Sequence, residues 1–162
     1  AYSEAKELYY GNTFTPDANG TFRFTYGKIK GYNPADAVYY SPFTSIIGIL
    51  EKSASTGDYY LPDSIKTVIS KQISASDNEK TKNVVAMLYN TDTSGGNSGS
   101  PVLDAEGKLV GLNFDRAYEA TINDFAWNES YSRSIGVDIR YILWVMKNIG
   151  NAENLIKEMN VN

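Results

Sequence analysis

The stretch TSGGNSGSPVLD, residues 93–104, indicates a tight loop that turns directly into a β-strand. Three glycines surround Ser98, and glycine suits sharp turns because it carries no Cβ. Pro101 ends the loop, and two apolar runs on either side of a short turn predict a β-hairpin over 101–114. The apolar run KNVVAMLYN, 82–90, predicts the strand that enters the loop. We therefore expect Ser98 on an exposed turn between two strands.

This loop has the composition that a nucleophilic serine needs. Such a serine requires an exposed hydroxyl on a sharp turn and free backbone amides that stabilise the developing oxyanion. The amides of Gly96 and Ser98 are the natural donors. A glycine- and serine-rich hairpin loop without chemistry is the plainer interpretation of a short Gly-x-Ser-Gly match. The longer pattern, a strand followed by GGNSGSPV, a turn and LVGL, favours catalysis. We predict Ser98 as the nucleophile and Gly96 as an oxyanion donor.

The composition limits the other chemistry that this chain can perform. It has 162 residues, a net charge of −4, no cysteine and no histidine. Disulfides and thiolate metal sites are therefore excluded, no calcium-loop spacing is visible, and we expect no cofactor and no metal. No basic cluster points to nucleic acid, and no apolar run is long enough for a membrane span. A nucleophilic serine without a histidine predicts that this chain is one segment of a longer protein.

The pattern of apolar residues predicts a mainly β chain with helices at its C-terminal end. A closed antiparallel barrel with a helix docked outside it is the expected architecture. The expected elements are a helical turn in 1–10, a half-buried strand over 21–29, a loop over 31–43, a helix over 62–73 capped by Asp63, the strand 82–90, the hairpin 101–114, a strand over 132–138, a helix from 139 capped by Asp138 and stopped by Gly150, and a last helical stretch over 151–159.

Two long stretches resemble a known family. The serine loop and its hairpin are similar to the second barrel of chymotrypsin-fold serine proteases, whose triad histidine and aspartate come from the first barrel. In detail, 90–119 and 131–159 resemble the C-terminal end of the bacterial S46 peptidases, the dipeptidyl peptidases 7 and 11. The segment TFRFTYGKIKGYNPADAVYY, 21–40, resembles the same family upstream of the serine, and the resemblance is weakest in 51–80.

The resemblance implies a place for this chain in a larger enzyme. S46 peptidases interrupt a double barrel with a large helical domain, and the serine follows that domain. Residues 1–162 would then be one domain, the C-terminal barrel lobe, with a leading segment over 1–20 and a helical part over 138–159. Its partners would be the first barrel, the helical domain and peptides with a free N-terminus; a homodimeric parent is left open. The implied location is the periplasm, the medium or the cell surface of a Gram-negative bacterium.

The dipeptide Asp115–Arg116 bears on substrate choice. By resemblance, the aspartate binds the substrate's N-terminal amine, and the next residue separates the subfamilies: glycine goes with apolar side chains at the cleavage position and arginine with Asp or Glu. Physically, a guanidinium at the end of a pocket can hold a carboxylate through two hydrogen bonds. An ordinary solvated Asp–Arg pair is the alternative. Asn97 replaces the aspartate that precedes the serine in trypsin-like enzymes, which removes the ground for expecting activation by a newly cut N-terminus.

The sequence leaves several hypotheses open. The favoured one is the serine-bearing segment of a dipeptidyl peptidase specific for acidic residues, with no choice made between Asp and Glu. A lobe of a glutamyl endopeptidase shares GNSGSPV, but that family uses a histidine in this lobe. A barrel that serves only as a binding module is a third hypothesis. A serine–lysine dyad with Lys82 or Lys108 is a fourth, although neither lysine has recognisable dyad spacing from Ser98.

Overall fold

The computed structural model describes residues 2–11, 22–75 and 84–160, and its centre is an antiparallel sheet. Five strands lie in the order β3-β4-β7-β6-β5, and every neighbouring pair is antiparallel. Their bounds are β3 (Phe43–Ser45), β4 (Val84–Tyr89), β5 (Pro101–Leu103), β6 (Leu109–Arg116) and β7 (Ser134–Asp138). A second sheet pairs β1 (Tyr32–Ala35) with β2 (Val38–Tyr40).

The sheet is open, so the predicted closed barrel is wrong for the described residues. Its edge strands β3 and β5 have three residues each and do not pair with one another. Edges this short offer few backbone groups for closure. The broader prediction of a mainly β chain with antiparallel strands and C-terminal helices is confirmed.

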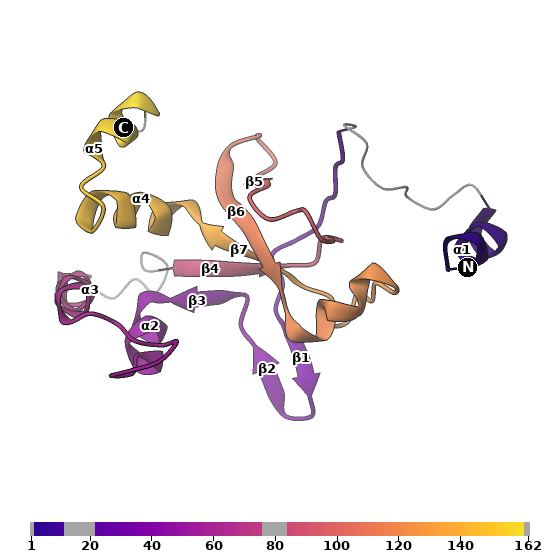
Figure 1. The fold of residues 1–162 in the computed structure, drawn as a ribbon, viewed down its shortest axis with the longest axis horizontal. Coiled ribbons are helices and arrows are strands. Elements are labelled where there is room, and N and C mark those ends of the chain that lie inside the picture. The colour runs from indigo at the N-terminus through magenta and orange to yellow at the C-terminus, as the bar shows by residue number, and fades with distance from the viewer. Residues whose placement is uncertain (1, 12–21, 76–83, 161–162) are drawn as a thin grey trace.

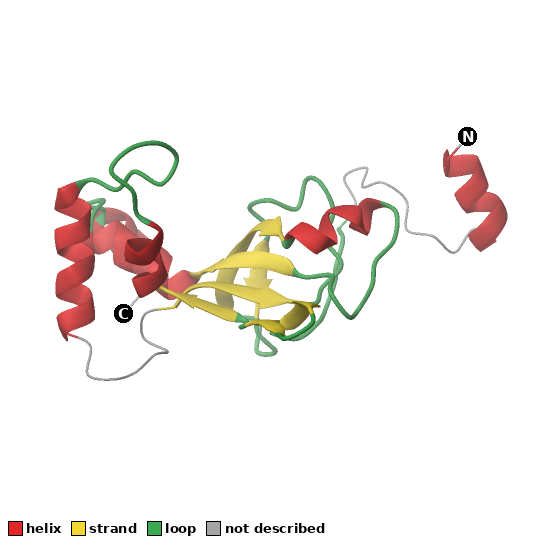
Figure 2. Cartoon of the chain, turned by 90° about the horizontal axis from the view of Figure 1, so that it is seen from below, coloured by secondary structure: helices red, strands yellow, loops and turns green. Residues whose placement is uncertain are grey.

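Helices gather at one end of the five-stranded sheet, as Figure 1 and Figure 2 both show. These are α2 (Ile46–Lys52), α3 (Asp63–Ala75), α4 (Ile139–Asn148) and α5 (Glu153–Glu158), whereas α1 (Tyr2–Tyr10) lies at the other end of the molecule. The predicted helices are confirmed; α2 was not predicted. Asp138 caps α4 as expected, because its carboxylate accepts a 2.8 Å hydrogen bond from the Arg140 amide. Asp63 is instead the first residue of α3.

Two predictions near the N-terminal end are wrong. The described part of 21–29 forms no strand; its pairing is a single bridge between Ile29 and Tyr89. Phe22, Phe24 and Tyr26 alternate as in a strand but are 90, 74 and 85% exposed, because no described element covers them. The expected loop over 31–43 contains the β1–β2 hairpin and ends at the first residue of the edge strand β3, Phe43.

The buried side chain of Arg133 fastens the sheet to the segment before β1. Arg133 is 1% exposed and stacks its guanidinium over the ring of Tyr32. Its nitrogens donate to backbone carbonyls of Lys30, Gly31 and Glu129 at 2.9–3.3 Å and of Ser132 at 2.7 Å. Burial lowers the pKa of this guanidinium. These bonds hold together segments about one hundred residues apart in sequence.

Candidate active site

The serine loop connects β4 to β5 at the end of the sheet opposite the clustered helices (Figure 1). Gly96 and Gly99 have φ angles of 91° and 85°, in the left-handed region that favours glycine. Asn97 closes the turn, because its Oδ1 accepts a 2.7 Å hydrogen bond from the Ser94 amide. The predicted tight glycine turn is therefore present.

Backbone hydrogen bonds fasten the loop to β6. The Gly99 amide donates to the Asn113 carbonyl at 2.7 Å, and the Asn113 amide donates to the Ser100 carbonyl at 2.9 Å. The side chain of Asn113 is buried and adds two bonds: Oδ1 accepts from the Tyr89 hydroxyl at 2.6 Å, and Nδ2 donates to the Asn97 carbonyl at 3.3 Å. Burial raises the pKa of Tyr89, so this phenol remains a donor. Sequence reasoning missed Tyr89 and Asn113; an asparagine inside the apolar run LVGLNF was the available signal.

Ser98 presents its hydroxyl beside β6. The residue is exposed, and its Oγ donates to the Phe114 carbonyl at 3.1 Å. Across residues 2–11, 22–75 and 84–160, no group accepts a hydrogen bond from the amide of Gly96 or of Ser98. Two free amides next to an exposed hydroxyl could stabilise an oxyanion formed on a carbonyl that the serine attacks.

The lysine-dyad hypothesis finds no support in this geometry. Lys108 precedes the first residue of β6, whereas Ser98 lies against Phe114 near its other end. Six residues of extended strand separate these positions by about 20 Å. The other candidate, Lys82, lies outside the described residues.

Asp115 and Arg116 follow directly on the residue that contacts Ser98. A bulge interrupts the pairing of β6 with β7 between Asn113 and Asp115. The exposed carboxylate of Asp115 accepts a 2.8 Å hydrogen bond from the Arg116 amide. The structure thus brings Ser98, Gly96, Asp115 and Arg116, the four predicted site residues, to one end of β6.

Arg116 is held by a carboxylate that sequence reasoning missed. Its two terminal nitrogens, Nη1 and Nη2, donate to Oδ1 and Oδ2 of Asp124 at 3.0 and 2.9 Å. Asp124 ends the 3₁₀ helix η2 (Tyr118–Asp124), which follows β6. The hydrogen bond from Arg116 lowers the pKa of Asp124, and the same bond raises the pKa of Arg116. Burial, followed by the negative charge of Asp124, raises the pKa of the neighbouring Asp92.

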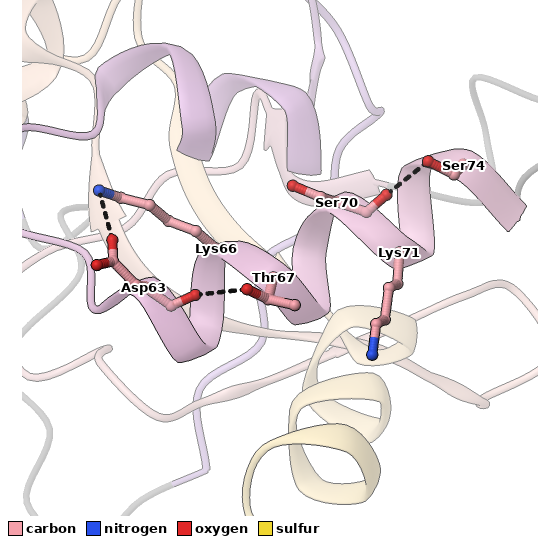
Figure 3. Close-up of a pocket in the computed structure, with 6 residues that line it drawn as sticks. All are labelled: Asp63, Lys66, Thr67, Ser70, Lys71 and Ser74. Atoms are coloured by element: carbon pink, nitrogen blue, oxygen red, sulfur yellow. Dashed lines mark hydrogen bonds and ion pairs between the residues drawn. The ribbon is translucent and has the colours of Figure 1, made fainter.

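A surface depression elsewhere in the molecule carries no comparable chemistry (Figure 3). It runs along α3, which precedes β4, whereas the serine loop follows β4. Its side chains bond mainly within their own helix: Thr67 and Ser74 donate to carbonyls four residues earlier, and Lys66 pairs with Asp63 at 3.4 Å. The lining residues are Asp63, Lys66, Thr67, Ser70, Lys71 and Ser74.

The described ranges offer neither a metal site nor a membrane-spanning helix. They contain no group of three acidic side chains that could hold a metal ion. No helix within them has both the length and the apolar character needed to cross a membrane.

Known proteins resemble this chain over nearly its whole length. The Asp/Glu-specific dipeptidyl-peptidase of Flavobacterium psychrophilum is 43% identical over an alignment of 155 residues, and the match covers 94% of this chain and 22% of that protein. The enzyme of the same name from Shewanella putrefaciens is 40% identical and covers 96% of this chain and 25% of its own length. Dipeptidyl-peptidase 7 of Porphyromonas gingivalis is 37% identical, and the match covers 98% of this chain and 22% of that protein.

A solved structure matches as well. The crystal structure of Porphyromonas endodontalis DPP11 in complex with the dipeptide Arg-Asp superposes with a TM-score of 0.84 at 37% identity, covering 97% of this chain and 23% of that one. This chain therefore spans only about a fifth to a quarter of the length of the relatives it matches. The family model described as Peptidase S46 matches residues 1–161. The chain belongs to the S46 peptidase family.

Proposed function

We propose that this chain is the C-terminal, serine-bearing segment of a serine exopeptidase that removes dipeptides from peptide N-termini and prefers Asp or Glu at the second residue. The observation that carries the proposal is the position of Ser98 beside the strand end that bears Asp115 and Arg116. The names of relatives at 40–43% identity, Asp/Glu-specific dipeptidyl-peptidases, support the same substrate class.

The chain supplies the nucleophile and the proposed oxyanion donors, but not the base. Because it has no histidine, we assign the triad histidine and aspartate to the remainder of a longer protein, of which it would be one domain, the C-terminal lobe. The relatives are four to five times longer, which leaves room for a first barrel and a helical domain. By the same resemblance, we place the protein in the periplasm, the medium or at the cell surface of a Gram-negative bacterium.

The proposed reaction begins at Ser98. Its Oγ attacks the carbonyl carbon of the second substrate residue and gives its proton to the histidine from elsewhere in the protein. The amides of Gly96 and Ser98 bind the resulting oxyanion. The C–N bond then breaks, and the leaving amine takes the proton from the histidine. Water hydrolyses the remaining dipeptidyl ester, which releases the dipeptide and restores the serine hydroxyl.

Two charges at the end of β6 would select the substrate. The exposed carboxylate of Asp115 is free to pair with a terminal ammonium, which limits cleavage to the second peptide bond. Arg116, whose side chain is 21% exposed, would bind the carboxylate of an acidic second residue. Together the two residues would require opposite charges at the two ends of one dipeptide.

The direct test uses Ser98→Ala in the full-length protein. We expect the loss of all detectable hydrolysis of Asp- and Glu-containing dipeptidyl reporters, because no acyl-enzyme can form, and the loss of labelling by a fluorophosphonate probe. Ser100→Ala is the matched control, since it removes a hydroxyl two residues away, and it should still be labelled. Retained labelling of Ser98→Ala would show that another serine is the nucleophile.

A further inference from the structure

The ion pair between Arg116 and Asp124 uses only part of the guanidinium. Asp124 contacts the end of the group, where Nη1 and Nη2 each donate one hydrogen bond. A guanidinium has five N–H donors in one plane. The side edge, formed by Nε–H and a second hydrogen of the adjacent terminal nitrogen, can hold another carboxylate through two bonds. Among the residues that the structure describes, none accepts a hydrogen bond from the Arg116 Nε.

The fold holds Asp124 firmly in place. It ends η2, and the amide of the next residue, Phe125, donates to the Ile122 carbonyl at 2.9 Å. The preceding side chain, Asn123, is buried, and its Oδ1 accepts a 2.7 Å bond from the buried Ser132 hydroxyl. The carboxylate therefore comes from an anchored element and can fix the orientation of a flexible arginine.

We propose that Asp124 is a positioning residue for substrate selection: it holds the end of the Arg116 guanidinium so that the side edge faces the carboxylate of an acidic substrate. This inference rests on the proposed function, and it assigns to Asp124 a part in it. Asp124 and the substrate occupy different edges of one planar group, so the substrate need not displace Asp124. The substrate brings an ammonium together with its carboxylate, so its binding adds no net charge to the site.

The test compares Asp124→Asn with the unchanged full-length protein on matched dipeptidyl reporters that carry Glu or Gln at the second position. We expect kcat/KM for the Glu reporter to fall about tenfold, mainly through KM, because the guanidinium is no longer aligned. The Gln reporter should change less than twofold. Asp124→Glu keeps the charge but moves the arginine, and it should give an intermediate value. Asp63→Asn is the control, since it removes another surface carboxylate that pairs with a cation, Lys66, and it should change neither rate.

The other outcomes contradict the inference in different ways. A faster Glu reporter with Asp124→Asn would mean that Asp124 competes with the substrate for Arg116. Equal falls on both reporters, or a lower melting temperature with no change in the Glu-to-Gln ratio, would reduce Asp124 to a structural residue. If the unchanged protein does not distinguish Glu from Gln, the proposed function itself fails. If it does and Asp124→Asn preserves the ratio, only the role of Asp124 fails.

Discussion

The serine loop and the Arg116 ion pair lie at the same end of β6, but different forces hold them. Neutral hydrogen bonds among the loop backbone, Asn113 and Tyr89 hold the loop, and the side chains of Asn113 and Tyr89 are buried. One charged pair, whose carboxylate side chain is 46% exposed, holds Arg116. Under the proposed function, the chemistry common to all substrates would depend on a loop anchored to two buried side chains, whereas selectivity would depend on a surface pair. Changes to the first region should affect all substrates alike, and changes to the second should separate acidic substrates from the others.

The largest loss of activity should be seen when this chain, which carries both regions, is assayed without the rest of the protein. The purified 162-residue chain should be essentially inactive, because loss of a triad histidine costs on the order of 10⁶-fold in turnover and this chain has no histidine. Dipeptidyl reporters, with Ser98→Ala as the blank and circular dichroism as the check of folding, give the measurement. Hydrolysis above the blank by a folded chain would contradict the need for a histidine and would favour a lysine as the base.

Arg116→Gly in the full-length protein should separate the two substrate classes. It removes the cation, so kcat/KM for acidic substrates should fall by about 10²–10³-fold, the equivalent of a buried charge pair. Apolar substrates should be spared or improved, because they form no ion pair with Arg116 and glycine opens the pocket. The rates of both classes decide the matter. An equal fall in kcat/KM for both classes would mean that Arg116 supports the fold. Unchanged rates for both would mean that Arg116 does not contact the substrate.

Asp115→Ala should weaken every substrate that carries a free N-terminal amine. We expect a loss of about 10²-fold in kcat/KM, as for the loss of a charge-assisted hydrogen bond. N-acetylated reporters should already be poor substrates of the unchanged enzyme, since they offer no ammonium. Equal cleavage of acetylated and free reporters would contradict the role of Asp115 and favour an endopeptidase.

The smallest effect should come from Tyr89→Phe, which tests the serine loop. The variant removes the 2.6 Å bond to Asn113, so stability should fall by about 1 kcal/mol. Turnover should decrease about threefold, by the same factor for Glu and Gln reporters, since the loop serves both. Urea unfolding and the two rates measure this. A change in the Glu-to-Gln ratio would show that the two regions are coupled.

Local signals made much of the fold predictable. The cap at Asp138 and the spacing of apolar residues after it identify α4, and the turn between two apolar runs identifies the β5–β6 hairpin. The segment 22–28 failed because alternation shows only what a strand would bury, not whether a partner strand exists. The β1–β2 hairpin was missed because its turn places Ala37 at a φ of 57°, which alanine rarely adopts.

The candidate site also contains residues that local sequence signals predict and residues that they do not. Ser98, Asp115 and Arg116 lie within one stretch of nineteen residues that begins in a recognisable motif, so the sequence alone could propose them as candidates. Tyr89 meets Asn113 only through pairing across the sheet, 24 residues apart. Asp124 contacts Arg116 only because η2 turns back after β6. No residue pattern in the sequence predicts that turn.

The hydrogen bonds of Arg133 should not depend on pH, in contrast to the ion pair at the candidate site. Its acceptors are backbone carbonyls, which do not take up protons between neutral and acid pH, so its bonds persist as the medium is acidified. The Arg116–Asp124 pair behaves differently, because the pKa of Asp124 is lowered in the folded chain. Its contribution is complete above the ordinary pKa of an aspartate and disappears as the pH falls through the lowered value. If Asp124 has the role proposed above, acid should weaken the preference for acidic substrates while the bonds from Arg133 to Gly31 persist.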